Sequence, residues 1–202
     1  MLFRSMAIKS GAVMRENEPL LAIQKELDGF YVFKTPGKSR RAKFILAADG
    51  VASKTLTLLK WPKFRPEDLV LTITQEMKST PGHIKQTLHE DCVHLFFGIK
   101  DLIPLGYAWL FPKSDTITVG WGNNLSKIYN TKTEFQKFKA LPMVQTSLGN
   151  SSLVVEKPHM IPVGTRSLLY QENVFAIGDA GGLVDPISGK GIPYAKIGRA
   201  HV

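Results

Sequence analysis

The segment NVFAIGDAGGLVDPISGKGIPYA, residues 173–195, constrains the fold more than any other part of the chain. An apolar run at 174–177 is followed at once by a glycine, a carboxylate and a glycine-rich segment. This pattern predicts a buried strand, a tight loop and then a helix entered through Gly189 and Gly191. Glycines let the bare backbone approach a ligand, and N–H groups at a helix start favour an anion. Asp179, at the strand's carboxyl end, is placed to accept a hydrogen bond from a sugar or ribityl hydroxyl.

A second predicted strand ends in the same way. The apolar run 42–47 leads to Ala48-Asp49-Gly50, and residues 51–60 have helical spacing with Ser53 near the start. Taken alone, an Asp-Gly pair after a strand is most often a turn. Together with residues 173–195 it indicates a ligand site, because α/β sheets bind ligands at the carboxyl ends of their strands.

Composition places the chain among ordinary globular proteins. It has 202 residues, 44% of them hydrophobic and 21% charged, so we expect a packed core. The net charge of +9 does not indicate nucleic-acid binding, because the cations are scattered and no helix-turn-helix pattern or zinc spacing occurs. The basic balance suits an anionic dinucleotide or a phospholipid surface. We predict no metal site.

Other features point to a cytoplasmic location. Cys92 is the only cysteine, which favours a reducing compartment. No apolar run approaches the ~20 residues of a membrane span, and the first residues lack the apolar core of a signal peptide. We therefore expect a cytoplasmic protein, with peripheral contact to a membrane surface as an option.

The rest of the chain alternates between strand and helix patterns. We expect residues 6–10 to be the last turn of a helix, and we expect further helices at 51–60 and 131–148. We expect strands at 12–14, 20–25, 30–34, 42–47, 69–78, 92–98, 106–111, 116–121 and 174–177. The strands between 69 and 121 are predicted to form one antiparallel sheet.

The segment PLGYAWLFPK, residues 104–113, carries an unusual row of rings. Period-two spacing puts Tyr107, Trp109 and Phe111 on one face of a strand. The three rings then form a continuous aromatic wall. Such a wall is more often ordinary core than a ligand site.

Three motifs together resemble the geranylgeranyl reductase family, within the hydroxylase-type superfamily of FAD-dependent oxidoreductases. GDAGGLVDPISGKGI resembles the family's second flavin motif, GDAAGLVDPxxGEGI, and departs from it at Gly181 and Lys190. ILAADGVASKT resembles the other flavin motif, and PLGYAWLFPK matches the family's PxxYxWxFPK at every fixed position. The third motif separates this family from hydroxylases that share only the flavin motifs.

The resemblance implies a cofactor, FAD, and two sets of site residues. The cofactor-binding set is Asp49, Gly50, Ser53, Gly178, Asp179, Ala180, Gly181, Gly182, Asp185, Pro186, Gly189, Gly191 and Ile192. The substrate-binding set, implied to line a cavity for an isoprenoid chain, is Pro104, Tyr107, Trp109, Phe111 and Pro112. No catalytic residue or proton donor can be assigned from the sequence.

The same resemblance implies the fold class and the function. We expect an α/β (α+β) fold in which residues 1–60 and 166–202 form part of a Rossmann-like FAD-binding domain. Residues 61–165 would form a substrate-binding domain built on an antiparallel sheet. The implied activity is reduction of C=C bonds in geranylgeranyl groups on lipid or tetrapyrrole precursors, with electrons from a reduced nicotinamide or a ferredoxin-type donor.

One expected motif is absent from the sequence. Flavoproteins of this superfamily begin with a strand and a G-x-G-x-x-G turn, which the chain does not contain. The residues at both ends resemble translated sequencing adapters, so we expect the native part to be about Met6 to Lys196 of a longer gene product. We predict that the isolated chain binds FAD weakly or not at all and is inactive. An FAD-dependent monooxygenase or halogenase, and an inactive gene fragment, are the alternatives.

Overall fold

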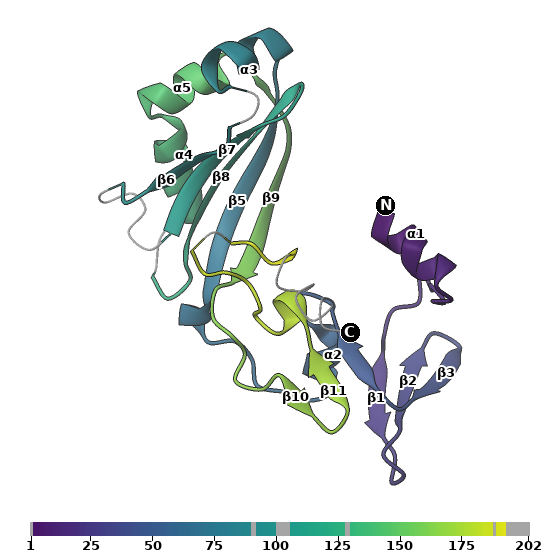
Figure 1. The fold of residues 1–202 in the computed structure, drawn as a ribbon. Coiled ribbons are helices and arrows are strands. Elements are labelled where there is room, and N and C mark those ends of the chain that lie inside the picture. Colours follow the sequence, from purple (N-terminus) through teal and green to yellow (C-terminus); the bar gives the residue numbers. More distant parts are fainter. Residues whose placement is uncertain (1, 90–91, 100–105, 128–129, 188, 193–202) are drawn as a thin grey trace.

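The computed structural model describes residues 2–89, 92–99, 106–127, 130–187 and 189–192 (Figure 1). Its helices are α1 (Leu2–Lys9), α2 (Lys54–Leu58), α3 (Pro81–Thr87), α4 (Thr131–Lys139) and α5 (Pro142–Leu148), with short 3-10 helices η1 (Pro66–Asp68) and η2 (Gly178–Ala180). Strands in the described ranges form three sheets, two of them antiparallel. The predicted mixed α/β fold is confirmed.

The first sheet is a meander of three antiparallel strands. They are β1 (Ala22–Lys25), β2 (Tyr31–Thr35) and β3 (Lys38–Ala42). The predicted Asp28-Gly29 turn joins the first two strands, and Gly29 takes a φ of +83°, which favours glycine. The predicted single strand 42–47 is wrong in its start: β3 ends at Ala42, and a separate strand begins at Ile45.

The second sheet contains a parallel pair of strands, and each strand of the pair precedes one of the two acidic motifs. Strand β11 (Val174–Ala176) lies between β10 (Tyr170–Gln171) and β4 (Ile45–Ala47). Val174 is opposite Ile45, and Ala176 is opposite Ala47. The order leaves β4 at the edge of this sheet among the described residues. The Leu46 residue of this strand is 64% exposed.

The third sheet is the largest and runs in the order β6-β7-β8-β5-β9. Its strands are β5 (Leu69–Lys78), β6 (His94–Phe97), β7 (Gly106–Pro112), β8 (Thr116–Asn124) and β9 (Ser152–Pro162), all antiparallel to their neighbours. The four strands predicted between 69 and 121 are confirmed. The long strand β9 had no sequence signal, because most of its residues are exposed on both sides and show no alternation.

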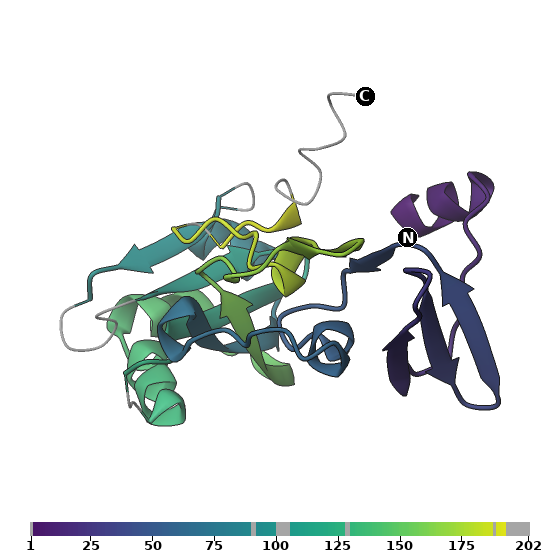
Figure 2. The same ribbon diagram turned by 90° about the horizontal axis from the view of Figure 1, so that it is seen from below.

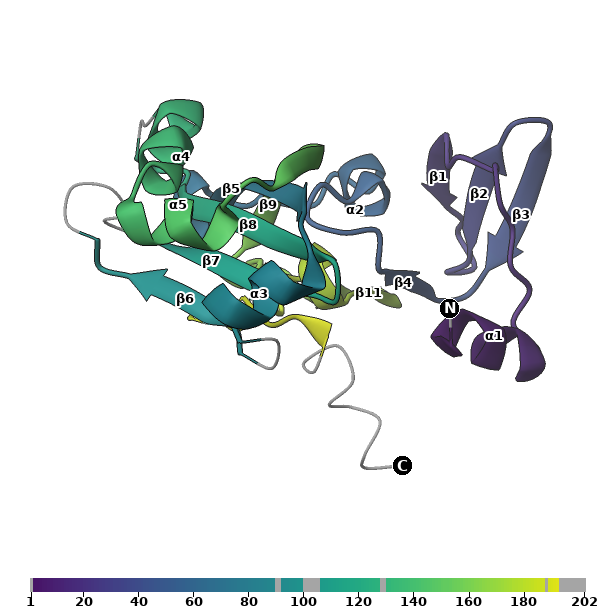
Figure 3. The same cartoon turned by 90° about the horizontal axis from the view of Figure 1, so that it is seen from above.

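Helices α3, α4 and α5 cover one face of this sheet (Figure 3). Phe135 and Phe138 of α4 are fully buried where this helix packs on β5 and β8, as helical spacing predicts for residues three apart. The predicted single helix 131–148 is wrong, because Pro142 cannot continue the helix and instead begins a second one.

The other face of the same sheet is covered by a segment near the carboxyl end of the protein. Figure 2 shows residues 183–187 lying across the face opposite to α4 and α5. A second core lies away from this sheet and joins the parallel pair, the meander and α2 through buried side chains that include Tyr31, Ile45, Leu56 and Val174.

Three further sequence-based expectations concern a strand, a helix and membrane-spanning segments. The predicted strand 12–14 is wrong, because those residues take no regular structure after the helix stop at Gly11. The predicted helix after Gly191 falls on residues beyond 192, outside the described part. No described helix has the length and apolar character needed to cross a bilayer.

Candidate functional site

The two acidic motifs lie side by side at one end of the parallel pair. Because β4 and β11 are parallel neighbours in register, the residues that follow them leave the sheet at the same edge. Asp49 follows β4, and Asp179 follows β11. The structure therefore brings together two motifs that are separated by 130 positions in the sequence.

Asp49 organises the start of helix α2. Its carboxylate accepts a hydrogen bond from the Ser53 hydroxyl and another, 2.8 Å long, from the backbone N–H of Thr55. Ser53 in turn caps the helix by accepting from the Leu56 N–H. Burial opposes ionisation of Asp49, but these hydrogen bonds outweigh it and hold the carboxyl pKa below its usual value. Asp49 is therefore a fixed negative charge at this corner.

The Gly178–Gly182 segment turns sharply instead of continuing as a helix. The Gly178 carbonyl accepts from the N–H groups of both Gly181 and Leu183, each at 3.0 Å. Gly182 has a φ of +70°, and a Cβ there would lie 2.2 Å from the Gly164 carbonyl oxygen. Only glycine allows the chain to pass so close to its neighbour.

Arg166 holds this turn in place and was missed by the sequence analysis. Its Nε donates to the Ala180 carbonyl at 2.9 Å, and its Nη1 donates to the Pro62 carbonyl. The guanidinium carbon Cζ lies 4.2 Å from the centroid of the Phe64 ring. Burial lowers the pKa of the guanidinium, while the negative charge of Asp49 opposes that change. A lone arginine in a predicted connection gives no signal in the sequence.

The aromatic row of β7 lies on the open face of the large sheet. Tyr107 and Trp109 have ring centroids 5.5 Å apart, and Trp109 and Phe111 are stacked at 6.0 Å. Phe97 of β6 extends the row, 5.3 Å from Tyr107. The alternate residues Ala108 and Leu110 face the helices instead. The period-two prediction for the three β7 rings is confirmed.

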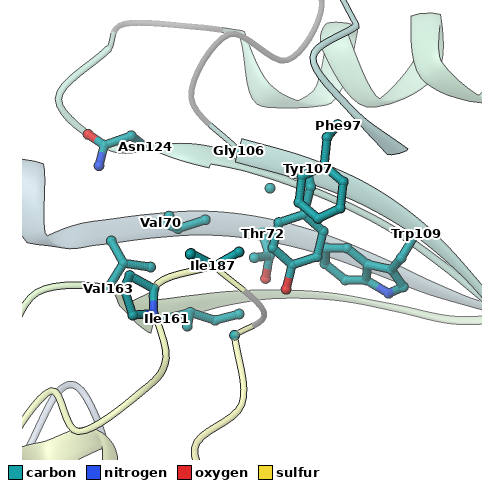
Figure 4. A pocket seen from close by; sticks show the side chains of 13 residues that line it. Val70, Thr72, Phe97, Gly106, Tyr107, Trp109, Asn124, Ile161, Val163 and Ile187 are labelled. Carbon is teal, nitrogen blue, oxygen red and sulfur yellow. The ribbon is translucent and has the colours of Figure 1, made fainter. Parts of the chain in front are cut away.

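An apolar cavity of about 370 Å³ lies between this face and the carboxyl-terminal loop (Figure 4). Strands β5 to β9 supply most of its walls, and Pro186, Ile187 and Gly189 supply the side formed by the loop. Its volume lies in the range of small-molecule sites. The described wall residues are Val70, Thr72, Phe97, Gly106, Tyr107, Trp109, Gly122, Asn124, Ile161, Val163, Pro186, Ile187 and Gly189. None of these side chains carries a charge.

Tyr107 is the point where the aromatic row meets the loop. A Cβ on Gly189, which has a φ of +69°, would lie 2.6 Å from the Tyr107 hydroxyl oxygen. Burial raises the pKa of this phenol, and the negative charge of Asp185 raises it further. Tyr107 therefore keeps its proton at neutral pH. The loop turn is closed by hydrogen bonds from the Gly189 N–H to the Asp185 carbonyl, and from the Asp185 N–H to the Lys190 carbonyl.

Two glycines of β8 also shape the cavity and were missed by the sequence analysis. Gly120 lies under the Trp109 indole, and a Cβ there would lie 2.0 Å from two of its ring carbons. Gly122 lines the cavity itself, beneath Thr72 and Val70. Glycine inside a strand often marks a close approach of another group, so the spacing G-x-G was the available signal.

The predicted site residues separate into groups in space. Tyr107, Trp109, Pro186 and Gly189 line the apolar cavity. Ser53 lines a different hollow, of about 520 Å³, together with Arg166. Phe111 and Pro112 follow Trp109 along β7 and do not line the cavity. Pro104 lies outside the described residues. The remaining predicted residues belong to the two acidic corners and the loop: Asp49, Gly50, Gly178, Asp179, Ala180, Gly181, Gly182, Asp185, Gly191 and Ile192.

The acidic corners have properties that a dinucleotide such as FAD requires. Gly50 has a φ of +83°, and the space that its Cβ would occupy is open. The Asp179 carboxylate is half-buried, and within the described residues no hydrogen bond to it is found, so it can accept from a hydroxyl of a ligand. An open glycine turn beside an acceptor carboxylate therefore fits a dinucleotide such as FAD.

Comparison with solved structures defines the fold class. A geranylgeranyl bacteriochlorophyll reductase-like protein from Thermoplasma acidophilum has a TM-score of 0.80, with 23% identity over 96% of this chain and 49% of that one. Aklavinone-11 hydroxylase, solved with FAD and aklavinone, has a TM-score of 0.70 with 16% identity over 96% and 38% of the two chains. The chain therefore shares the fold of these two proteins.

Comparison with curated proteins narrows the class. The chain is 30% identical over 194 residues to a digeranylgeranylglycerophospholipid reductase of Methanococcus vannielii, covering 93% of this chain and 47% of that protein. It is 34% identical over 166 residues to a chloroplastic geranylgeranyl diphosphate reductase of Arabidopsis thaliana, covering 80% and 33%. No protein-family model matches. The chain is therefore similar in sequence to geranylgeranyl reductases, and it spans about half the length of the first of these relatives.

Proposed function

We propose that this chain is the substrate-binding part, and part of the flavin-binding site, of an FAD-dependent reductase that saturates C=C bonds of geranylgeranyl groups. The observation that carries the proposal is the contact between the glycine loop and the aromatic strand. Gly189 lies against the Tyr107 hydroxyl, and both line one uncharged cavity. A reductase of a long alkene needs such a junction, because its cofactor and an apolar chain must meet where water is excluded.

The site residues have distinct proposed roles. Asp179 would accept a hydrogen bond from a sugar hydroxyl of FAD, and the loop from Gly181 to Gly191 would lie along the cofactor. Asp49 keeps α2 and the neighbouring corner in place through its hydrogen bonds. Reduced FAD, when bound, supplies hydride to an alkene carbon.

The cavity wall itself contributes binding and exclusion of water. Its side chains are apolar or neutral, so an isoprenoid chain can enter without leaving a buried charge unpaired. The Tyr107 phenol holds its proton at neutral pH because burial and Asp185 both raise its pKa. It therefore presents a hydrogen-bond donor, not an anion, where the loop meets the cavity.

The wider assignment follows from the same proposal. We propose that residues 1–60 and 166–202 belong to the FAD-binding domain and residues 61–165 to the substrate-binding domain. The substrate is an isoprenoid lipid or another prenylated precursor, and electrons come from a reduced nicotinamide or a ferredoxin-type protein. We place the protein in the cytoplasm, and its net charge of +9 supports peripheral docking on an anionic membrane surface.

A chimera tests the proposed reaction. The aligned half of the Methanococcus vannielii relative is replaced by this chain, and the purified chimera is checked for bound flavin by absorbance. With chemical reductant and a geranylgeranyl lipid, we expect products that have gained one hydrogen molecule per double bond, measured by mass spectrometry.

The matched control is the same chimera carrying Asp179→Ala, which should lose flavin without losing the fold. A chimera that binds FAD but leaves every double bond intact would contradict the proposal. Oxygen insertion or halogenation of an aromatic substrate would support the monooxygenase or halogenase alternative instead.

A further inference from the structure

We infer that Trp109, seated flat on Gly120, is the end wall of the apolar cavity and sets the length of prenyl chain that the cavity accepts. The inference deepens the proposed function and rests on it for the identity of the ligand. It assigns to one residue of the aromatic row a task that its neighbours Tyr107 and Phe111 do not share.

The first argument is where the cavity stops. On β7 the lining residues run from Gly106 to Trp109 and do not include Phe111, although Phe111 lies on the same face of the strand. On β5 the lining ends at Thr72, and on β8 at Gly122. All three strands therefore leave the cavity at the level of the Trp109 indole, which closes one end of it (Figure 4).

The second argument is that the indole has a fixed seat. A Cβ at position 120 would lie 2.0 Å from ring atoms Cε2 and Cζ2 of Trp109 and 2.6 Å from Nε1. No side chain larger than hydrogen fits beneath a ring in that position. Gly120 therefore lets the indole lie against the sheet.

The third argument is that the wall is rigid and uncharged. Trp109 is only 8% exposed and lies between the rings of Tyr107 and Phe111. Packing on three sides restricts its rotamers, so the ring cannot swing aside to admit a longer chain without disturbing its neighbours. A fixed apolar wall limits ligand length by steric exclusion.

A fixed end wall also selects which part of the bound prenyl chain meets the glycine loop. Tyr107 is two residues before Trp109 on the same face, and its hydroxyl lies against Gly189. A prenyl chain whose end rests on the Trp109 indole therefore presents a defined set of its carbon atoms to the glycine loop. The distance from Trp109 to Tyr107 then determines which double bond is aligned there.

Two substitutions with opposite effects test the inference. The 202-residue chain is titrated by calorimetry with geraniol, farnesol, geranylgeraniol and geranylfarnesol, which differ by one isoprene unit each. Trp109→Ala opens the cavity towards Phe111, so the longest alcohol should bind at least about tenfold more tightly than to wild type, since each buried methylene contributes roughly fourfold. Geraniol binding should change little.

Gly120→Ala has the reverse effect because the new methyl group lifts the indole off the sheet into the cavity. We expect the longer alcohols to lose at least about tenfold in affinity while geraniol keeps most of its affinity. Phe44→Ala is the control: it removes a ring that is 56% exposed and does not line the cavity, and it should leave the order of affinities unchanged. Thermal unfolding by circular dichroism verifies that each variant is folded.

The outcomes separate this inference from the proposed function. A length profile that is the same in wild type, Trp109→Ala and Gly120→Ala would overturn the end wall, even if the chimera reduces geranylgeranyl lipids. Absence of binding of all four alcohols to the folded wild-type chain would also overturn it. Opposite shifts in the two variants support the end wall, even if the chimera reduces no alkene.

Discussion

The two faces of the large sheet are built from the same strands and serve different purposes. Towards the helices, Ala108 and Leu110 of β7 are fully buried against Phe135 and Phe138. On the opposite face, Tyr107 and Trp109 line a cavity. One strand thus contributes alternate residues to a core and to a site. Aromatic content alone does not distinguish the core face from the cavity face, because both carry aromatic rings. The role of each face depends on which segments cover it.

Phe138→Ala is the substitution that should most clearly expose the difference between the faces. Phe138 of α4 is fully buried on the side of the helix that faces the sheet. The centroid of its ring lies 5.3 Å from that of Phe96 in an edge-to-face pair. Removing it leaves a cavity in a closely packed core, so we expect a loss of about 3–5 kcal/mol in the free energy of unfolding. Urea denaturation measures this loss, and a change below about 1 kcal/mol would mean that the helix face is not the core.

Glu76→Gln tests the polar end of the open face and should have an intermediate effect. Burial opposes ionisation of Glu76, but hydrogen bonds from Lys113, Thr116 and Thr118 outweigh it and hold its pKa below the usual value. A carboxylate with a lowered pKa stabilises the fold above its unfolded pKa, and that contribution disappears as the pH falls through the folded value. The variant should lose about 1 kcal/mol at pH 7.

The pH dependence gives the sharper measurement. As the pH falls through the lowered pKa of Glu76, the wild-type carboxyl becomes protonated as well, so the difference between wild type and Glu76→Gln should shrink. Denaturation midpoints measured between pH 7 and pH 3 follow this change. A difference that is constant over the whole range would show that the charge of Glu76 does not contribute.

Phe97→Ala should have the smallest effect on stability and is the counterpart of Phe138→Ala. Phe97 belongs to the same sheet but is 54% exposed on the open face. Its removal should cost no more than about 1 kcal/mol of unfolding free energy, because the ring is only partly withdrawn from water. It should still weaken binding of prenyl alcohols, because Phe97 lines the cavity. A loss of stability equal to that of Phe138→Ala would make the two faces equivalent.

The sequence predicted those parts of the fold whose signal is local. Strand β5 has the predicted bounds, because Pro and charged residues precede it and the turn-forming segment Ser-Thr-Pro-Gly follows it. Ser53 was predicted near the start of α2 and caps it. That the Asp49 and Asp179 motifs lie together followed from a rule about where α/β sheets bind ligands, not from any single residue.

The remaining features depend on contacts between distant residues. Helix α3 is short and polar, and its only fully buried side chain, Ile84, gives no period to detect. The role of Arg166 depends on the carbonyl groups of Ala180 and Pro62, which reach it from separate segments. Gly120 has meaning only once Trp109 of the neighbouring strand is placed above it. Such pairings are set by register, which single-sequence patterns do not specify.

The edge position of β4 has a practical consequence for handling the protein. Its outer backbone groups and the exposed Phe44 and Leu46 offer a ready template for another strand. In a concentrated solution of this chain, a second molecule can add to that template, and turbidity should then rise with protein concentration. Replacing Leu46 by lysine is a direct way to keep such preparations monodisperse.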